Sequence, residues 1–253
     1  MHMTTAIGID LGGTNIKGAL INAATGEILH QTVQATGSNT SHSNGAGSHW
    51  KKVICQIVQE LKSKSIYPVD ALGLAAPGLP NTSNTSIINM PGRLDGLENL
   101  IWSEVLQEKE LWVLNDAHAA LMAEATFGVG QNFKNIVMLT LGTGVGGGIL
   151  INGELYQGNY QMAGHLGHMT LDVDREDPGI TGMPGTLENA MGDATVAIRS
   201  FKKFTSTKSL VAAHLQGDTF ATYVWLNSVR KLALGICSIC NLLSPDLIIL
   251  GAA

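Results

Sequence analysis

Charged residues are scarce in this 253-residue chain: Asp, Glu, Lys and Arg together make up 14% of it, against about 25% in an average soluble domain. The formal net charge is -5, so no excess of basic residues favours binding along a nucleic-acid backbone. No run of 18 or more residues is entirely apolar, and we therefore expect no membrane-spanning segment. The chain also begins without a basic region followed by an apolar stretch, which predicts a cytoplasmic protein without a signal peptide.

Cysteine is equally rare. The three cysteines, Cys55, Cys237 and Cys240, are too few and odd in number for a disulfide framework, which favours a reducing compartment. Cys237 and Cys240 have the spacing of a redox pair, but they lie within residues 218–243, a mostly apolar stretch that predicts a long buried helix. Buried core thiols are the favoured interpretation of this pair.

Apolar residues make up 45% of the chain, enough for a sizeable core in one large domain or in two lobes of about 100–150 residues. Short apolar runs alternate with turn signals and with stretches of helical periodicity, which predicts an α/β fold. The predicted strands are residues 6–9, 16–21, 28–34, 71–75, 111–114, 136–141, 149–151 and 247–250. The predicted helices are residues 50–61, 117–127 and 218–243.

Two glycine-rich turns each join one predicted strand to the next, near Asp10–Thr14 and Leu141–Gly148. Glycine lets the backbone approach a phosphate closely, and consecutive N–H groups in such a turn form an anion site. No Gly-Lys-Ser/Thr follows either turn, and neither turn leads into a helix, so neither is a P-loop or a dinucleotide fingerprint. A tight hairpin without a ligand is the alternative interpretation of each turn.

The two turns belong to an internal repeat. A shift of 130 residues places Gly12 on Gly142 and Gly18 on Gly148, and both copies run strand, glycine turn, strand. The repeat predicts two lobes that each begin with the same hairpin and face each other across a cleft. Chance similarity of two buried hairpins is the alternative.

Three side chains of the first turn suit a nucleotide. The carboxylate of Asp10 can hold Mg²⁺, or a water bound to it, beside the phosphates. Thr14 can donate its hydroxyl to a phosphate oxygen. Lys17 can add positive charge, although its place in an alternating strand would equally let it point outward.

Five motifs, in this order along the chain, resemble those of the ROK family (repressors, open reading frames and kinases). They lie at residues 10–17, 115–120, 142–148, 164–168 and 187–188. The family includes glucokinases, fructokinases, allose kinases and N-acetylmannosamine kinases. The resemblance implies an actin-like, hexokinase-type α/β fold with two RNase-H-like lobes, at residues 1–115 and 116–253. A covering segment that the family has after its last strand leads us to expect further residues beyond Ala253.

The resemblance also implies roles for single residues. Asp116 corresponds to the catalytic base, for which helix capping by Asn115-Asp116 is the compatible simpler interpretation. The implied substrate-binding residues are Asn115, His165, His168, Glu188 and Gly78. The implied nucleotide-binding residues are Asp10, Gly12, Gly13, Thr14, Lys17, Thr143, Gly144, Gly146 and Gly251, with Asp10 also a ligand of the Mg²⁺ that accompanies ATP.

The sequence departs from the family pattern at two places. His165 stands where the family has a sugar-binding glutamate, and an imidazole cannot accept two hydroxyl hydrogen bonds at once as a carboxylate does. The family's zinc ligands are one histidine, here His168, and three cysteines, but no cysteine lies between His168 and Glu188 and Thr186 stands at the last ligand position. A structural zinc site needs four such ligands, so we expect no zinc.

These features predict an ATP-dependent kinase of a hexose, with glucose as the default, or of an N-acylated hexosamine. The alternative is a sugar-binding sensor of the same family with little or no activity, which the His165 substitution motivates. A DNA-binding repressor is disfavoured because the chain begins at its first strand, and a filament or chaperone ATPase because His168 and Glu188 suit a small polar substrate. The expected partners are a sugar and ATP, without nucleic acid or membrane, and the family suggests a homodimer.

Overall fold

The structure is a computed structural model that describes residues 4–37, 49–90, 94–176, 178–179 and 182–252. The chain divides into two compact units, Met1–Ala120 and Leu121–Ala253. The sequence-based boundary after Asn115 falls at the start of helix α3 (Asp116–Phe127), whose last residues lie in the second unit.

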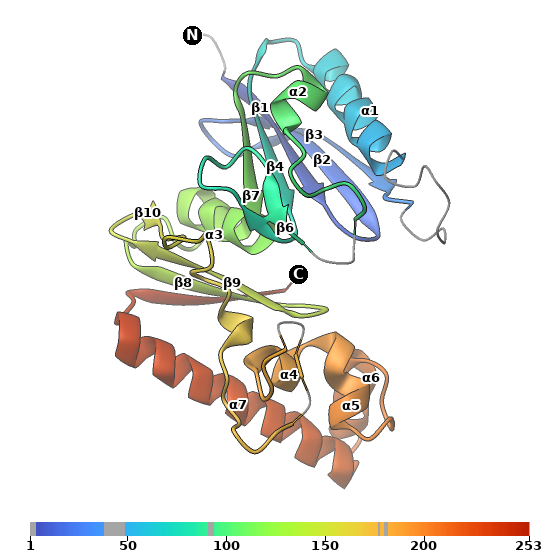
Figure 1. The fold of residues 1–253 in the computed structure, drawn as a ribbon, viewed down its shortest axis with the longest axis vertical. Coiled ribbons are helices and arrows are strands. Elements are labelled where there is room, and N and C mark those ends of the chain that lie inside the picture. The colour runs from blue at the N-terminus through green and yellow to red at the C-terminus, as the bar shows by residue number, and fades with distance from the viewer. Residues whose placement is uncertain (1–3, 38–48, 91–93, 177, 180–181, 253) are drawn as a thin grey trace. The chain divides into compact units, whose positions relative to one another are not determined.

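The first unit is built on a five-stranded sheet with the order β3-β2-β1-β4-β7. Its strands are β1 (Thr5–Leu11), β2 (Asn15–Asn22), β3 (Ile28–Ala35), β4 (Val69–Ala76) and β7 (Leu111–Asn115). The first three strands pair antiparallel, whereas β4 and β7 run parallel to β1 (Figure 1). A small hairpin of β5 (Leu79–Pro80) and β6 (Ile87–Asn89) follows β4.

Helix α1 (His49–Lys64) covers one face of this sheet. Its apolar residues recur every three or four positions, so one stripe of the helix is buried in the core of the unit. Gly18 of β2 allows the close approach, because a Cβ there would lie 2.3 Å from a methyl group of Ile57. The short helix α2 (Trp102–Leu106) adds Trp102, whose ring lies 5.7 Å from that of Trp50.

The second unit is built on a four-stranded sheet with the order β10-β9-β8-β11. The strands are β8 (Ile136–Leu141), β9 (Val145–Ile151), β10 (Glu154–Leu155) and β11 (Leu247–Ala252). Strands β8 and β9 form an antiparallel hairpin, and β11 runs parallel to β8. This order repeats that of β3-β2-β1-β4, so the repeated strand–turn–strand unit predicted from the sequence is confirmed.

Short helical elements and one long helix complete the second unit. They are η2 (Leu166–His168), α4 (Leu187–Met191), η3 (Asp193–Thr195), α5 (Val196–Arg199), α6 (Thr207–Leu215) and α7 (Thr219–Leu243). Leu232 and Ile239 of α7 pack into one cluster with Val137 and Leu139 of β8. Asp218 begins the helix by accepting a hydrogen bond from Ala221 N at 2.8 Å.

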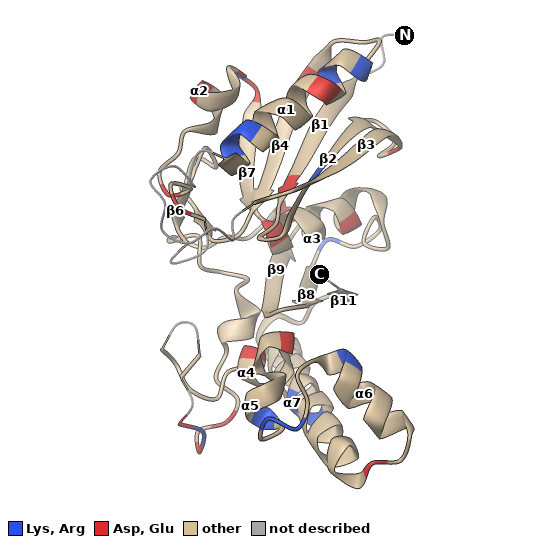
Figure 2. Cartoon of the chain, turned by 90° about the vertical axis from the view of Figure 1, so that its right-hand side faces the viewer, with Lys and Arg blue, Asp and Glu red and all other residues tan. Residues whose placement is uncertain are grey.

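The predicted burial of the long helix is wrong. Only one stripe of α7 is buried, and both Cys237 and Cys240 are exposed rather than core thiols. The apolar character of the helix is spread around its whole circumference, whereas the neighbouring elements cover a single face. Arg230 and Lys231 are the only charged residues among its 25 positions, so nearly all of α7 is tan in Figure 2.

Helix α7 is also the one helix in the described ranges that is long and apolar enough to cross a membrane by length and composition alone. Its buried stripe packs on β8, α4 and α6. These contacts are those of a helix at the surface of a globular unit.

Candidate active site

The first glycine turn closes the β1–β2 hairpin. Gly12 N donates to Asn15 O at 3.0 Å, and a Cβ on Gly12 would lie 2.7 Å from the same oxygen. A side chain at this position would therefore break the turn. A Cβ on Gly13, in contrast, would meet nothing within 4 Å, so the tip of the turn is open to a ligand.

Thr36, at the end of β3, holds this turn from the side. Its N–H donates to Thr14 O at 2.9 Å, and its hydroxyl donates to Gly12 O at 2.7 Å. The residue is completely buried. Thr36 could not be predicted from the sequence, because no local pattern shows that the end of β3 meets a turn more than twenty residues earlier in the chain.

Asp10 and Lys17 are cross-strand partners at the base of the first turn. Their side chains form an ion pair with Nζ and Oδ2 3.3 Å apart, and both are substantially exposed. With Gly8 and Gly73 they help to line an apolar hollow of about 480 Å³ on the sheet face. Among the described residues Lys17 is the only side chain paired with the Asp10 carboxylate, so the carboxylate retains an oxygen that a hard cation such as Mg²⁺ can bind.

Asn115 and Asp116 mark the end of β7 and the start of α3. Asn115 is buried, donates from Nδ2 to Gly78 O at 3.0 Å and accepts at Oδ1 from Ala117 N at 3.0 Å. It thus caps α3, as its sequence position predicts. Asp116 is exposed at the first turn of the helix and accepts from Ala117 N at 2.8 Å.

Gly78 lies against this cap in a conformation that requires glycine. Its φ is +102°, and a Cβ would lie 2.5 Å from Asn89 O. The parallel strands β1, β4 and β7 all end at one edge of the sheet, with Asp10 beside Ala75 and Ala76 beside Asn115. Adjacent strands are about 4.8 Å apart, so the first turn, Gly78 and Asp116 lie at the same edge of the first unit.

The second glycine turn closes the β8–β9 hairpin. Gly142 N donates to Gly144 O at 3.0 Å, and Thr143 is exposed at the tip. Gly251 of β11 pairs with Thr140, just before the turn. Thr143, Gly144, Gly146 and Gly251, four of the nucleotide-binding residues that the resemblance implies, therefore lie around one hairpin end of the second unit.

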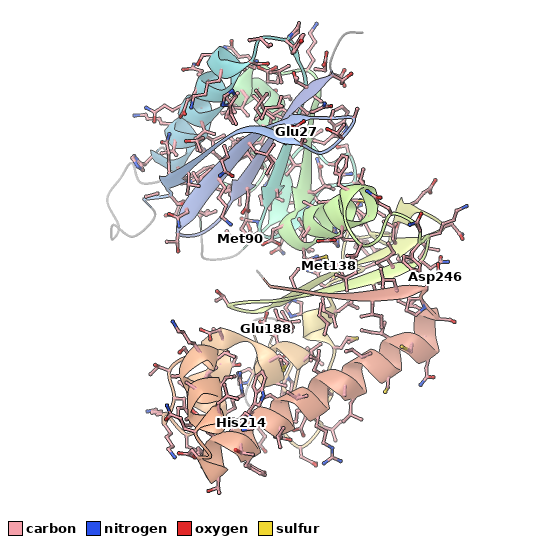
Figure 3. All side chains as sticks on the ribbon, turned by 180° about the vertical axis from the view of Figure 1, so that it is seen from behind. Glu27, Met90, Met138, Glu188, His214 and Asp246 are labelled. Carbon is pink, nitrogen blue, oxygen red and sulfur yellow. The ribbon has the colours of Figure 1, made fainter. Side chains whose placement is uncertain are left out.

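Glu188 reaches this turn from α4. Its Oε2 accepts a hydrogen bond from Val145 N at 3.0 Å. Figure 3 shows the Glu188 side chain at the end of α4 that faces the β8–β9 hairpin. The resemblance implies a sugar-binding role for Glu188, and no local sequence pattern predicts its bond to the second glycine turn.

His165 directly precedes the short helix η2, and His168 is its last residue. Their rings are parallel within 2°, with centroids 6.2 Å apart. Two glycine contacts hold this segment against β9: a Cβ on Gly147 would lie 2.7 Å from Gly164 O, and one on Gly167 would lie 1.9 Å from Val145 O. The segment that carries both histidines therefore packs closely against β9, the strand that begins at the second turn.

The loop between His168 and α4 is held by hydrogen bonds. Leu171 N donates to Gly185 O at 2.9 Å, and Leu187 N donates to Met169 O at 2.9 Å. Thr186 caps α4 by accepting from Asn189 N at 3.2 Å. In the part of the chain that the structure describes, no three His, Cys, Asp or Glu side chains form a group that would hold a metal.

Comparison with known proteins places these features in a family. The model of the ROK family matches residues 6–253. A glucokinase of Halalkalibacterium halodurans is 30% identical over 268 residues, which cover 97% of this chain and 79% of the relative. An N-acetylmannosamine kinase of Vibrio cholerae is 28% identical over 247 residues, covering 97% of this chain and 82% of the relative.

Solved structures of ROK proteins resemble this chain along nearly its whole length. A ROK hexokinase from Thermus thermophilus superposes with a TM-score of 0.83 at 25% identity, over 99% of this chain and 82% of that one. A Streptomyces griseus ROK glucokinase in complex with glucose and AMPPNP gives a TM-score of 0.75 at 24% identity, over 98% and 83%. The predicted actin-like, hexokinase-type fold is confirmed. The chain belongs to the ROK family and is a sugar phosphotransferase.

Proposed function

We propose that this protein transfers the terminal phosphoryl group of ATP to a hydroxyl of a hexose, glucose first, or of an N-acylated hexosamine. Some relatives are named glucokinase and others N-acetylmannosamine kinase, which supports these two classes of acceptor. The single observation that carries the proposal is Asp116. It is an exposed carboxylate that directly follows the buried Asn115, at the sheet edge where the first glycine turn also lies.

Asp116 acts as the general base in this proposal. A carboxylate at an exposed helix start can accept the proton of a sugar hydroxyl as that oxygen attacks the phosphorus. General-base assistance of this kind contributes about 10²–10⁴-fold to a rate. Asn115 and Gly78 help to orient the acceptor, and their mutual hydrogen bond keeps them fixed.

The resemblance also implies sugar-binding roles for three residues of the second unit. Glu188 accepts a hydroxyl hydrogen bond, and His165 and His168 each offer one ring nitrogen. His165 offers fewer acceptor positions than the glutamate that the family has there. We therefore expect the preference among sugars to differ from that of a typical family member.

In this proposal each of the two glycine turns can bind phosphate oxygens through backbone N–H groups and small side chains. The residues are Gly12, Gly13, Thr14 and Lys17 in the first turn and Thr143, Gly144, Gly146 and Gly251 around the second. Asp10 fits a magnesium ligand, since a half-exposed carboxylate supplies the oxygen that this ion prefers. Bound magnesium would neutralise part of the phosphate charge. We propose a cytoplasmic enzyme that works as a homodimer.

Coupled ADP release with Mg-ATP and a panel of hexoses and hexosamines tests the proposal. We expect release that depends on one sugar and that falls at least about 100-fold in Asp116→Asn, because a neutral amide cannot take the proton. Asp95→Asn is the matched control: Asp95 is an exposed carboxylate of the same unit without a described hydrogen bond, and its loss should leave the rate unchanged.

An equal rate in Asp116→Asn and in the unmodified protein would exclude Asp116 as the base. The second candidate function, a sugar sensor, rests on His165. It requires that a sugar raise the melting temperature while no sugar in the panel releases ADP.

A further inference from the structure

Three hydrogen bonds join the second glycine turn to helices α4 and η3. Asp193 N donates to Gly142 O at 2.9 Å, and Ala194 N donates to Thr143 O at 3.0 Å. The third bond runs in the other direction, from Val145 N to Glu188 Oε2 at 3.0 Å. Glu188 thus supplies the one side-chain contact among the three.

Two glycines allow this contact. A Cβ on Gly144 would lie 2.2 Å from Glu188 Oε2, and a Cβ on Gly192 would lie 3.0 Å from Thr143 O. Neither residue has a positive φ, so the requirement for glycine is one of space rather than of backbone conformation. Any side chain at position 144 must displace the Glu188 carboxylate.

The second oxygen of Glu188 remains available. A carboxylate has about four acceptor positions, and Val145 N is the only hydrogen-bond donor to this side chain among the described residues. The side chain is half-buried, so Oε1 can still reach a ligand. One carboxylate can therefore bind the phosphate turn through Oε2 and a sugar hydroxyl through Oε1 at the same time.

We propose that Glu188 couples sugar binding to nucleotide binding by bridging the second glycine turn and the sugar. This inference rests on the proposed function, in which the turn binds phosphates and Glu188 binds a hydroxyl. A sugar hydroxyl on Oε1 restricts the Glu188 side chain and so orders the turn before the nucleotide arrives, which lowers the ordering entropy that nucleotide binding must overcome. Coupling of this kind is reciprocal, and each ligand raises the affinity for the other by the same factor.

Two substitutions at position 188 separate the two bonds. Glu188→Gln keeps a carbonyl oxygen that can accept from Val145 N, but it replaces the second acceptor by an NH₂ donor. Glu188→Ala removes both acceptors. Glu154→Gln and Glu154→Ala, at an exposed position on β10 of the same unit, are the matched controls.

The first measurement is hydrogen exchange of the peptide that contains residues 142–147 in the ligand-free protein. Exchange of Val145 N–H should be about as slow in Glu188→Gln as in the unmodified protein and at least 10-fold faster in Glu188→Ala. Equal exchange in all three proteins would show that Glu188 does not hold the turn. This result does not depend on whether the protein is a kinase.

The second measurement is calorimetric binding of glucose, or of the sugar found in the kinase panel, with and without a non-hydrolysable ATP analogue. In the unmodified protein the analogue should tighten sugar binding about 5-fold or more, within the usual range of coupling. The ratio of sugar affinities with and without the analogue should fall toward one in both Glu188 variants and stay unchanged in both Glu154 variants.

Gly144→Ala tests the contact between Glu188 and the second glycine turn independently, by a change in the turn itself. Its methyl group displaces Glu188, so sugar affinity should fall although residue 144 is assigned to the nucleotide. In the Gly144→Ala/Glu188→Ala double variant the clash is absent, and the loss of sugar affinity should be no larger than in Glu188→Ala alone. Binding of both ligands without coupling in the unmodified protein would overturn the inference and leave the proposed function intact, whereas binding of neither would overturn both.

Discussion

Arg199 shows at the scale of one residue how the backbone around the second turn is fixed. Its Nη1 donates to Gly192 O and to Thr195 Oγ1, each at 2.6 Å, and its Nη2 donates to Met191 O at 3.4 Å. Burial lowers the pKa of this guanidinium from its usual value to about 10, and the charge of Asp193 opposes the shift. The group is thus still charged at neutral pH and satisfies carbonyl oxygens at the end of α4.

Replacement of Arg199 by methionine should destabilise the protein by about 1–3 kcal/mol, the usual cost of buried carbonyl groups that lose their donors. Methionine fills a similar volume, so little of this loss would come from a cavity. Urea unfolding measures the free energy of unfolding of the variant against the unmodified protein.

Arg230→Met is the control for the same substitution at an exposed position of α7, and it should change the free energy of unfolding by less than about 0.5 kcal/mol. Equal effects of the two substitutions would show that the Arg199 hydrogen bonds do not stabilise the fold.

The role of a residue could be predicted from the sequence where it depends on its chain neighbours. Asn115 follows an apolar strand and precedes an alanine-rich helix, and it caps that helix as predicted. Thr36 and the Glu188–Val145 bond depend on contacts between distant segments, which no local pattern reveals. Cys237 and Cys240 were wrongly predicted to be buried, because hydrophobicity alone does not show which face of a helix is covered.

At the scale of elements, Asp193 links η3 to the start of α6. Its Oδ1 accepts a hydrogen bond from Thr207 N at 2.6 Å. This bond, the side chain of Thr207 and the charge of Arg199 lower the pKa of Asp193 below its usual value. Because the folded-state pKa is lowered, the ionised carboxylate stabilises the fold above the unfolded-state pKa of about 3.9, and this contribution is lost as the pH falls through the lower folded-state value.

Asp193→Asn should therefore be less stable than the unmodified protein at pH 6–7, and the difference should shrink as the pH falls below about 4. Asparagine can still accept from Thr207 N, so the variant removes the charge and keeps an acceptor. Urea unfolding at several pH values between 7 and 3 measures the effect. A constant difference over this range, or the same profile in the Asp95→Asn control, would contradict the assignment.

Elements with a strong apolar pattern were predicted well, and short polar ones were missed. Every predicted strand is present within a few residues, as are α1, α3 and α7. Helices α2 and α4, each of five residues, escaped prediction because they are shorter than two helical turns. Helix α6 begins with a Ser206 capping box, a signal that was readable in the sequence but is confined to a polar, serine-rich stretch.

For the whole molecule, the repeated hairpin was the most informative sequence feature. It predicted that β8 and β9 repeat β1 and β2, and the two sheets share the order of four strands. Composition alone could not give this result, since 45% apolar residues suit many α/β folds. The family motifs predicted the type of fold, and the pattern of strands and turns explains why the chain adopts it.

The whole chain should be equally stable with and without a metal chelator. No cysteine lies between His168 and Glu188, and the loop between η2 and α4 is held by backbone hydrogen bonds and by the ion pair of Lys231 with Asp172, 2.6 Å apart. Such bonds need no metal, whereas a structural zinc site supplies folding free energy that a chelator removes. The melting temperature with EDTA should stay within about 2 °C of that without it, which for a chain of this size is less than about 1 kcal/mol.

Metal analysis of the purified protein should accordingly find well under one zinc per chain. Asp172→Asn tests whether the ion pair with Lys231 stabilises this loop: its loss should lower the melting temperature in the presence and absence of EDTA alike. Stoichiometric zinc together with a large fall in melting temperature on chelation would show that His168 still binds the metal with ligands other than cysteine.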